Sequence, residues 1–500
     1  MIIKKDQSVI QNYLQDCSGV CGANADFVAI AEAEHDISEF LVEMSKSDTS
    51  VTVAGALTGN TASGLAFGGA VLSLEKLNKI GKIDKIDDKN AVIAVQAGAR
   101  LNDIKLEVYK AGWMYPPDPT ESSSSIGGNI STNASGGRGF KFGSTRDYIK
   151  ALKVIFSDGS SCFVERGEYC GNENGKIIFD TDKGKKQIVL PKYHLPIIKN
   201  AAGYYNYPGA DLVDVFIGSE GTLGVIVEAV LKLIPRFTEV FGGIIFFKKR
   251  NDAYEFVNKV KDISKKTRKQ GLKDSINAMS LEYFDENTLH LISSDYPTIP
   301  RYAEAAIMFE QDVYEDNNQD ILMEKWIEII ENCGINLETV WFASNLIEQE
   351  HFRVFRHKIP ERVNEMVKKT GIAKVGTDFA VPEGCLSNIV DFCDKEFKKV
   401  GAFNLTFGHI GENHLHANIV AVNDEEYKKC RQVYANIAQK VVELGGTVSA
   451  EHGIGKLRHV FLKKMIGEEG FKEMAKFKSM FDNYGILGCD NIFPKKYSQL

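Results

Sequence analysis

The chain has 500 residues, of which 44% are hydrophobic and 25% are charged, and its formal net charge is −7. This composition is typical of a soluble globular protein. The length exceeds what one ordinary core supports, so we expect two domains, or one domain with a large insertion. The acidic balance and the lack of a basic face argue against a nucleic-acid-binding protein.

The N-terminal sequence and the cysteines narrow the class of protein further. The N-terminal sequence MIIKKDQSVIQNYLQD lacks an apolar signal segment, and no window holds eighteen uninterrupted apolar residues. We therefore expect a cytoplasmic protein, or one that is peripheral to the membrane. The nine cysteines include no CxxC pair, which argues against an iron–sulfur cluster within this chain.

Up to about residue 235, short apolar runs alternate with glycine-rich breaks. Residues 27–46 (FVAIAEAEHDISEFLVEMSK) predict a strand and then a helix, which Asp36 or Ser38 could cap. Residues 148–164 predict a hairpin with its turn at Asp158–Gly159. Residues 211–234 predict a short helix, a glycine break and a β-branched strand. This order indicates an α+β fold with mixed sheets.

A change of pattern after Pro235 suggests a domain boundary. Strands are expected at 240–247, 276–285 and 304–313, with an amphipathic helix at 251–270 between the first two. This order predicts a ferredoxin-like, split βαβ domain. We therefore predict three parts: a first domain at 1–235, a cap or substrate domain at 236–440, and a C-terminal helical segment at 441–500 that packs back on the first domain.

A thirty-one-residue segment at 116–146, PPDPTESSSSIGGNISTNASGGRGFKFGSTR, is rich in small and polar residues. A structureless loop of this length is uncommon unless it carries a function. Glycine and serine let backbone N–H groups approach a flat, anionic ligand closely. The alternative is a flexible linker, which the interleaved apolar residues disfavour. The sequence contains neither a GxGxxG motif after the first strand nor a P-loop.

Three of the ten histidines fall within FGHIGENHLHANIV, residues 407–420. A reversal at 411–413 would place His409 and His416 on neighbouring strands, with His414 on the same face as His416. Two neutral imidazoles suit zinc, manganese or iron, and Glu451 in SAEHGIGKLR is a candidate third ligand. The alternative is that the histidines only satisfy backbone groups.

Four segments occur in an order and spacing that resemble one family. They are PPDPTESSSSIGGNISTNASGG, FIGSEGTLGVIVEAVLKLIP, FGHIGENHLHANIV and SAEHGIGKLR. Together they resemble FAD flavoproteins of the vanillyl-alcohol oxidase/p-cresol methylhydroxylase type. The branch they resemble most includes D-lactate and D-2-hydroxyglutarate dehydrogenases and the glycolate oxidase catalytic subunit. The resemblance implies a two-subdomain FAD-binding domain beneath a cap domain.

The resemblance also implies which residues contact FAD. They are Gly55, Ala56, Thr58, Gly59, Asn60, Pro117, Asp118, Ser125, Gly127, Gly128, Asn129, Thr132, Asn133, Ala134, Gly137, Glu220, Gly221, Gly224, Val225 and Ile226. No histidine lies in these loops, so non-covalent binding is expected. Where the family reads RGGGTG, this chain reads AGALTG (54–59), a departure that predicts weaker or shifted flavin binding.

For the chemistry, the resemblance implies that His409, His416 and Glu451 bind a divalent metal. In an extended segment His452 points away from Glu451, so it could face the substrate, and it is the candidate catalytic base.

The resemblance places Arg356 at the substrate carboxylate. Lys374 is a second candidate cation there, and the alternative for both is a surface salt bridge. Asn418, two residues after His416 on the same strand face, could contact flavin or substrate. The chain reads GENHLH where relatives read GDGNLH, so His414 replaces an asparagine and Asn413 a glycine. That departure bears on the geometry and the identity of the metal.

The expected reaction is oxidation of a D-2-hydroxy acid to the 2-oxo acid. The metal would lower the pKa of the hydroxyl, His452 would take its proton, and hydride would pass to flavin N5. Electrons would leave to an electron-transferring flavoprotein, an iron–sulfur subunit or a quinone, and a homodimer is the default expectation. The alternatives are an FAD-dependent alkylglycerone-phosphate-type synthase and a flavoprotein subunit without its own catalysis.

Overall fold

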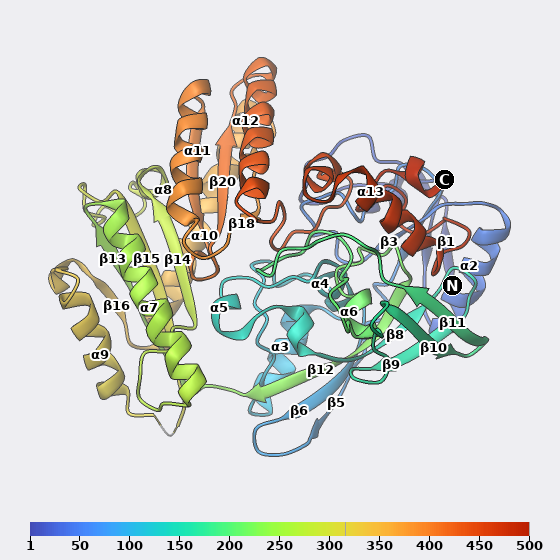
Figure 1. Cartoon of the computed structure of the whole chain (residues 1–500), viewed down its shortest axis with the longest axis horizontal. Coiled ribbons are helices and arrows are strands. Elements are labelled where there is room, and N and C mark those ends of the chain that lie inside the picture. Colours follow the sequence, from blue (N-terminus) through green and yellow to red (C-terminus); the bar gives the residue numbers. More distant parts are fainter. Residues whose placement is uncertain (316, 500) are drawn as a thin grey trace. The chain divides into compact units, whose positions relative to one another are not determined.

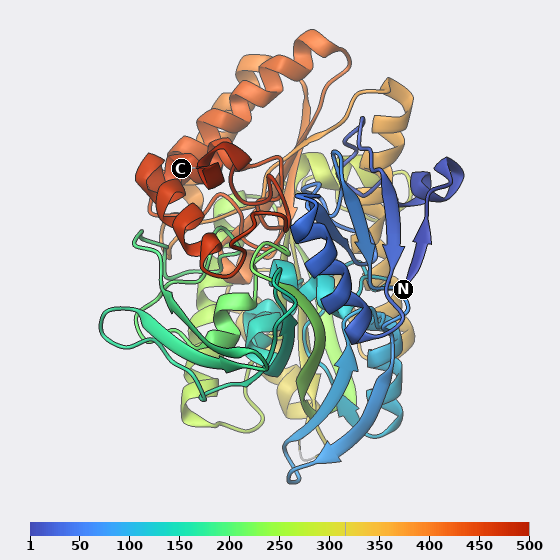
Figure 2. The ribbon, with the colours of Figure 1, turned by 90° about the vertical axis from the view of Figure 1, so that its right-hand side faces the viewer.

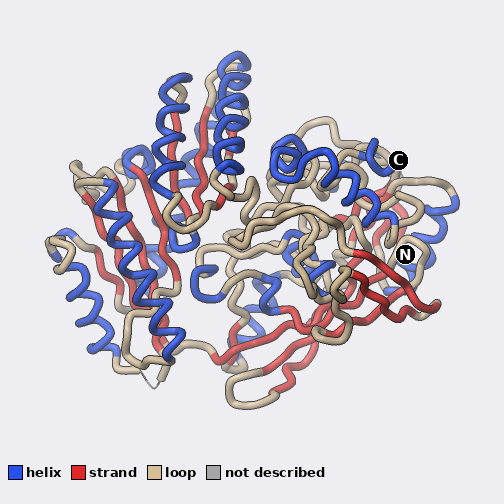
Figure 3. The backbone as a smooth tube through the Cα atoms, viewed as in Figure 1, coloured by secondary structure: helices blue, strands red, loops and turns tan. Residues whose placement is uncertain are grey.

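The computed structural model describes residues 1–315 and 317–499, and the chain divides into two compact units. Unit 1 comprises Met1–Ser135, Ser144–Pro235 and Ser449–Leu500, and unit 2 comprises Gly136–Gly143 and Arg236–Val448. Both units mix helices and sheets, as the expected α+β class requires (Figure 3). Among the described helices, none has both the length and the apolar character that a membrane span needs.

The first sheet of unit 1 has the strand order β1-β2-β4-β3, in which β2, β4 and β3 are parallel. Helix α2 (Glu34–Lys46) buries Ile37, Phe40 and Leu41 against this sheet (Figure 2). The strands are β1 (Ile2–Lys4), β2 (Phe27–Ile30), β3 (Val51–Ala54) and β4 (Ala70–Ser73).

The predicted cap of α2 was wrong. The helix begins one turn earlier than expected, so Asp36 lies in its first turn instead of at its cap. There the Asp36 carboxylate accepts hydrogen bonds from the N–H groups of Glu32 and Ala33, at 2.9 and 3.0 Å. Negative charge in this turn is favourable because the first N–H groups of a helix have no partner within it.

The second sheet of unit 1 is centred on the long strand β12, which pairs with β6 and β8. The turn between β8 and β9 confirms the predicted hairpin, since Gly159 adopts the left-handed φ of +71° that this turn requires. The strands are β5 (Ile80–Lys85), β6 (Ala91–Gln96), β7 (Trp113–Met114), β8 (Ile149–Ile155), β9 (Ser161–Glu165) and β12 (Val225–Pro235). A separate hairpin joins β10 (Lys176–Thr181) to β11 (Gly184–Val189).

The C-terminal segment is part of unit 1. Val51 N–H donates to the carbonyl of Ile486 at 2.7 Å, and Gly488 N–H donates to the carbonyl of Val51 at 2.9 Å. Leu487 lies in the same apolar cluster as α2. The remaining helices of this unit are α1 (Gln7–Ile10), α3 (Leu101–Lys110), α4 (Ile126–Thr132), α6 (Leu212–Phe216) and α13 (His459–Ser479).

The segment at 116–146 is not structureless, contrary to expectation. It contains α4, the short helix α5 (Gly139–Phe142) and the start of a 3-10 turn at Thr145–Tyr148. The Ser125 hydroxyl caps α4 by accepting from Gly128 N–H at 3.3 Å. Within this segment the chain leaves unit 1 after Ser135 and returns to it at Ser144.

Unit 2 is built on an antiparallel sheet of order β16-β13-β15-β14-β19-β20-β17, with β18 also paired to β20. Strands β13 and β14 flank β15 and are joined by α7 (Arg250–Gln270), which confirms the predicted split βαβ element. The strands are β13 (Glu239–Phe247), β14 (Ser280–Asp285), β15 (Ala305–Val313), β16 (Trp341–Ala343), β17 (Val375–Gly376), β18 (Phe379–Ala380), β19 (Phe403–Gly408) and β20 (His414–Val420).

Helices cover both faces of this sheet (Figure 1). Tyr283 on β14 packs against Tyr254 on α7, with ring centroids 5.8 Å apart. The next residue, Phe284, contacts Phe355 on α10 at 5.4 Å. Because successive side chains of a strand point to opposite faces, α7 and α10 lie on opposite sides. The helices here are α8 (Glu286–Ile292), α9 (Gln319–Glu331), α10 (Leu346–Thr370), α11 (Leu386–Val400) and α12 (Asp424–Glu443).

Candidate active site

A tight reversal between β19 and β20 brings the three histidines together. Strand β19 ends at Gly408, a 3-10 turn covers Ile410–Glu412, and β20 begins at His414. Asn413 has the left-handed φ of +53°, and its side-chain oxygen accepts from Lys261 Nζ at 2.9 Å. The reversal predicted at 411–413 is therefore confirmed. Asparagine suits this position because it is one of the few residues that tolerate a positive φ.

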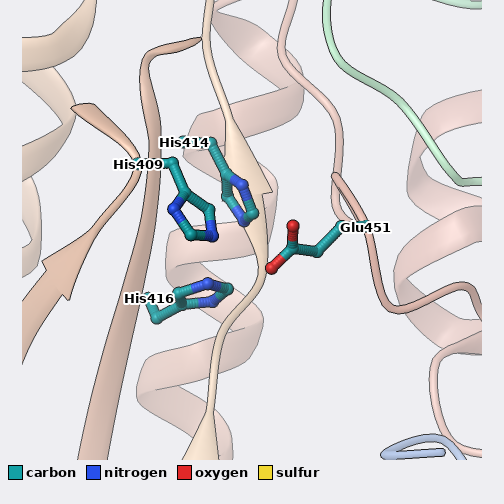
Figure 4. A group of neighbouring side chains, drawn as sticks. All are labelled: His409, His414, His416 and Glu451. Carbon is teal, nitrogen blue, oxygen red and sulfur yellow. The ribbon is translucent and has the colours of Figure 1, made fainter. Parts of the chain in front are cut away.

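The three imidazole rings form a compact, buried group (Figure 4). Their exposed fractions are 2% for His409, 0% for His414 and 8% for His416. Ring centroids are 4.5 Å apart for His414 and His416, 5.2 Å for His409 and His414, and 5.6 Å for His409 and His416. One nitrogen of each ring lies within 4.8 Å of a nitrogen of the others.

Each ring has a hydrogen-bond acceptor for one of its nitrogens. His409 Nδ1 lies against Glu282 Oε1, and His414 Nε2 is 2.9 Å from Asp378 Oδ1. His416 Nδ1 is 3.4 Å from the carbonyl oxygen of Thr377. Acceptors of this kind behind imidazoles are characteristic of metal sites, because they fix the tautomer and orient the ring. The donor set therefore fits a divalent metal.

Arg356, expected to bind the substrate carboxylate, forms a buried ion pair in unit 2. Its Nε is 2.9 Å from Glu282 Oε2, and the other oxygen of Glu282 contacts His409. Burial favours the neutral acid, but the charge of Arg356 and the hydrogen bond from His409 hold the pKa of Glu282 well below its usual range. Glu282 thus links two of the expected site residues.

The other two residues expected to contact substrate or flavin differ in exposure. Asn418 is buried on β20, two residues after His416 and on the same face, beside Gly376 on β17. Lys374 precedes β17 and its side chain is exposed. Of the two, Asn418 is therefore the better placed to share a site with the histidines of unit 2.

Glu451 and His452 belong to unit 1, where both side chains contact other residues of that unit. The Glu451 carboxylate accepts from Ser135 Oγ at 3.0 Å and pairs with Lys199 Nζ at 3.2 Å. An Arg458 nitrogen lies 3.5 Å from His452 Nδ1, at the limit of hydrogen bonding, so this contact does not fix the tautomer.

Glu220 holds the same loop in place. Its two carboxylate oxygens accept from the N–H groups of Ile454 and Gly455, each at 2.8 Å. Burial raises the pKa of Glu220 to about 7, although these two hydrogen bonds and the charge of Lys456 oppose the shift. Glu220 was expected to contact FAD, and its side chain holds the segment that carries His452.

Among the described residues, the loop after β3 leaves a run of N–H groups without main-chain acceptors. In the described part of the chain, the N–H groups of residues 55–60 donate to no main-chain carbonyl. Leu57 adopts φ +56° at a position where the related motif has glycine. Successive N–H groups around a left-handed residue form concave sites for phosphate. The AGALTG sequence therefore forms a left-handed turn at its leucine. Leucine instead of glycine at φ +56° costs about 1–2 kcal/mol.

The second expected FAD loop, around α4, has a mixture of roles. The N–H groups of Gly127, Ala134 and Glu220 bond internally to carbonyls at 2.8–2.9 Å, so they shape the loop. Asn129 is different. Its Nδ2 is buried and has no hydrogen-bond partner in the described part of the chain. A buried donor without an acceptor is costly, and a bound flavin would supply one.

The remaining expected FAD residues divide between the units. Asp118 pairs with Lys105. Gly224 precedes β12, whose first residues Val225 and Ile226 pair with β8. Gly137 lies in unit 2, where a Cβ would come 3.0 Å from Glu282 Oε1.

The partners of the histidines, Glu282, Asp378 and Thr377, were not predicted from the sequence. For Glu282 the available signal was a carboxylate in the middle of the strand SLEYFD, between the apolar Leu281 and Tyr283.

Comparison with known proteins gives two family matches. Residues 25–163 match the family described as FAD binding domain, and residues 250–492 match the C-terminal domain of FAD linked oxidases. The chain is 32% identical over 435 residues to the glycolate oxidase subunit GlcD of Bacillus subtilis, covering 86% of this chain and 80% of that protein.

Two further relatives span nearly the whole chain. A D-lactate dehydrogenase of Anaerostipes hadrus is 25% identical, covering 97% of this chain and 93% of its own length. A D-2-hydroxyglutarate dehydrogenase of Xanthomonas citri pv. viticola is 24% identical, covering 98% and 94%. Among solved structures, an alkyldihydroxyacetonephosphate synthase matches with a TM-score of 0.64 at 12% identity, covering 97% of this chain and 82% of that one. That last likeness concerns the fold alone.

Proposed function

We propose, from the premise that this chain belongs to the family of FAD-linked oxidases, that it oxidises a small 2-hydroxy acid to the 2-oxo acid. Glycolate, D-lactate and D-2-hydroxyglutarate, the compounds in the names of the relatives, share a carboxylate next to a carbon that bears a hydroxyl. The observation that carries the proposal is the buried group of three imidazoles, each with an acceptor behind one nitrogen.

FAD is the redox cofactor of the proposed enzyme, and when bound it accepts the hydride. The N–H groups of residues 55–60 would hold its phosphates, and the buried Asn129 amide would donate to it. The other loop residues support these two groups through internal hydrogen bonds.

The proposed metal ligands include His409 and His416 of unit 2 and Glu451 of unit 1. A divalent ion held there would polarise the substrate hydroxyl and make it a stronger acid. Glu282 and the Thr377 carbonyl would hold the two imidazoles in the tautomer that presents Nε2. Zinc, manganese and iron all accept this donor set.

His452 is the proposed base for the hydroxyl proton, and Arg356 the proposed anchor of the substrate carboxylate. The hydrogen bonds from Ile454 and Gly455 to Glu220 hold the segment that carries His452. In unit 2, Glu282 holds Arg356 through Nε, which orients the other nitrogens of the guanidinium. Each of these roles requires a fixed side chain, because a misplacement of about 1 Å costs roughly a hundredfold in rate.

Electron transfer to a partner completes the proposed cycle. The sequence provides no CxxC pair for a cluster of its own, so we propose an external acceptor, either a redox protein or a quinone. Slow reoxidation of the reduced flavin by oxygen is the expected behaviour. Rapid, stoichiometric release of peroxide during turnover would contradict it.

Anaerobic mixing with glycolate, D-lactate, L-lactate and D-2-hydroxyglutarate tests the function. Bleaching of the flavin absorbance by at least one of them is expected, with formation of the matching 2-oxo acid. In the His416→Ala variant bleaching should slow by at least about a hundredfold, since a metal ligand is lost. The matched control is His290→Ala, which removes an exposed histidine of unit 2. No bleaching in FAD-loaded wild type would overturn the proposal.

A further inference from the structure

We propose that His414 is a third imidazole ligand of the metal, so that this chain presents three histidines to the ion. The inference rests on the proposed function, which requires a metal at His409 and His416. It concerns the position where this sequence has His414 and the related motif has asparagine.

The first argument is position. His414 opens β20 and points to the same face as His416, two residues further along the strand. The two ring centroids are 4.5 Å apart, closer than any other pair in the group. His414 is completely buried, and its ring lies against those of His409 and His416.

The second argument is the protonation of the ring. Asp378 Oδ1 lies 2.9 Å from His414 Nε2, and neither side chain is exposed. A carboxylate accepts, so Nε2 carries the proton and a neutral ring keeps the lone pair on Nδ1. For His409 and His416 the acceptors lie at Nδ1, and their lone pairs are therefore on Nε2. All three rings are thus held in tautomers that leave one nitrogen able to bind a metal.

The third argument is the convergence of the rings. One nitrogen of each of the three imidazoles lies within 4.8 Å of a nitrogen of the others, so one ion can be reached by all three. The competing explanation is a purely structural contact between Asp378 and His414.

Pulsed EPR of Mn²⁺ tests the inference directly. The flavoprotein is stripped of metal with a chelator, loaded with Mn²⁺ alone, and the couplings to imidazole nitrogens are counted. Three are expected in the wild type and two in His414→Asn. The variant should also bind Mn²⁺ at least about tenfold more weakly. His290→Asn, at the exposed histidine of α8, is the matched control and should behave as wild type.

The outcomes separate this inference from the proposed function. Two couplings in the wild type would overturn the role of His414 and leave a metal-dependent oxidation by His409 and His416 intact. No Mn²⁺ coupling in any form would overturn the metal-dependent function and this inference with it. Because the wild-type count decides the matter, the test holds even if His414→Asn fails to fold.

Discussion

At the scale of single residues, buried carboxylates position the candidate catalytic groups. Glu282 in unit 2 joins Arg356 to His409, and its own side chain is 1% exposed. Such a group contributes little net stability as an ion pair, because desolvation offsets the attraction. Its removal is costly, however, since two buried groups lose their charged partner at once.

We expect Glu282→Gln to lower the free energy of unfolding by about 3 kcal/mol, because it breaks a buried charge network. Denaturant unfolding of the apoprotein measures this. Glu310→Gln is the matched control on the neighbouring strand β15, where the carboxylate is 19% exposed and pairs with Arg138 at 3.3 Å. That change should cost less than about 1 kcal/mol. Equal losses in the two variants would contradict the role given to Glu282.

Glu220 predicts a pH dependence of stability. Its pKa is about 7 in the folded chain, above the ordinary value of 4.5, because burial disfavours the carboxylate. The folded state therefore binds more protons than the unfolded state between these values, and stability falls as pH rises from about 5 to 7. The shift corresponds to about 3 kcal/mol. Unfolding free energies measured at pH 5 and pH 7.5 give this difference.

Glu220→Gln is the control for the pH effect. Glutamine has no titrating group, so this component of the pH dependence should vanish. A wild-type slope that persists unchanged in Glu220→Gln would assign the effect to another group.

At the scale of elements, the β19–β20 turn sets the spacing of the histidines. Its left-handed residue is Asn413, and substitution there separates two contributions. Asn413→Gly and Asn413→Ala both remove the hydrogen bond from Lys261, but only alanine is strained at φ +53°. We expect the alanine variant to be less stable than the glycine variant by about 1 kcal/mol.

Thermal unfolding of the two variants measures this difference, and metal content gives a second readout. The glycine variant should retain the metal-binding behaviour of wild type, since the turn is preserved. If both variants lose stability equally, the turn does not depend on the left-handed conformation of residue 413.

The elements show what the sequence could and could not predict. The hairpin around 411–413 was predictable because its turn residues and its alternation are local. The partners Glu282 and Asp378 were not, because they lie 127 and 36 residues from the histidines they contact. Their positions depend on the register of β14 with β19 and of β18 with β20, which local patterns do not specify. Helix α10 was missed, and it contains Pro360, an ordinary signal for a helix end.

Residue roles in the flavin loops were predictable only in part. The resemblance marked Gly127 and Glu220 as FAD contacts, and the structure shows their N–H groups bonded to the carbonyls of Ala97 and Ser131. A glycine-rich motif indicates that another group comes close to the backbone. It does not show whether that group is a ligand or another segment of the chain. For Gly127 the neighbour is Ala97, since a Cβ would lie 2.7 Å from the Ala97 side chain.

At the scale of the whole molecule, the two units have separate cores. In unit 1, Phe481 of the C-terminal segment is 1% exposed and stacks on Phe156 and Phe179 at 6.0 and 6.2 Å. In unit 2, Trp326 on α9 is fully buried and stacks on Phe309 at 4.0 Å. The segment after residue 448 thus completes a core that begins near the N-terminus.

Calorimetry of the apoprotein should therefore show two unfolding transitions, one for each core. Phe481→Ala and Trp326→Ala each remove a large buried ring, at a cost of about 3–5 kcal/mol. Each substitution should lower one transition by roughly 10 °C and leave the other in place. Phe163→Ala, at a side chain 47% exposed on β9, is the control and should move neither. A single transition that both core substitutions lower equally would show that the units unfold as one.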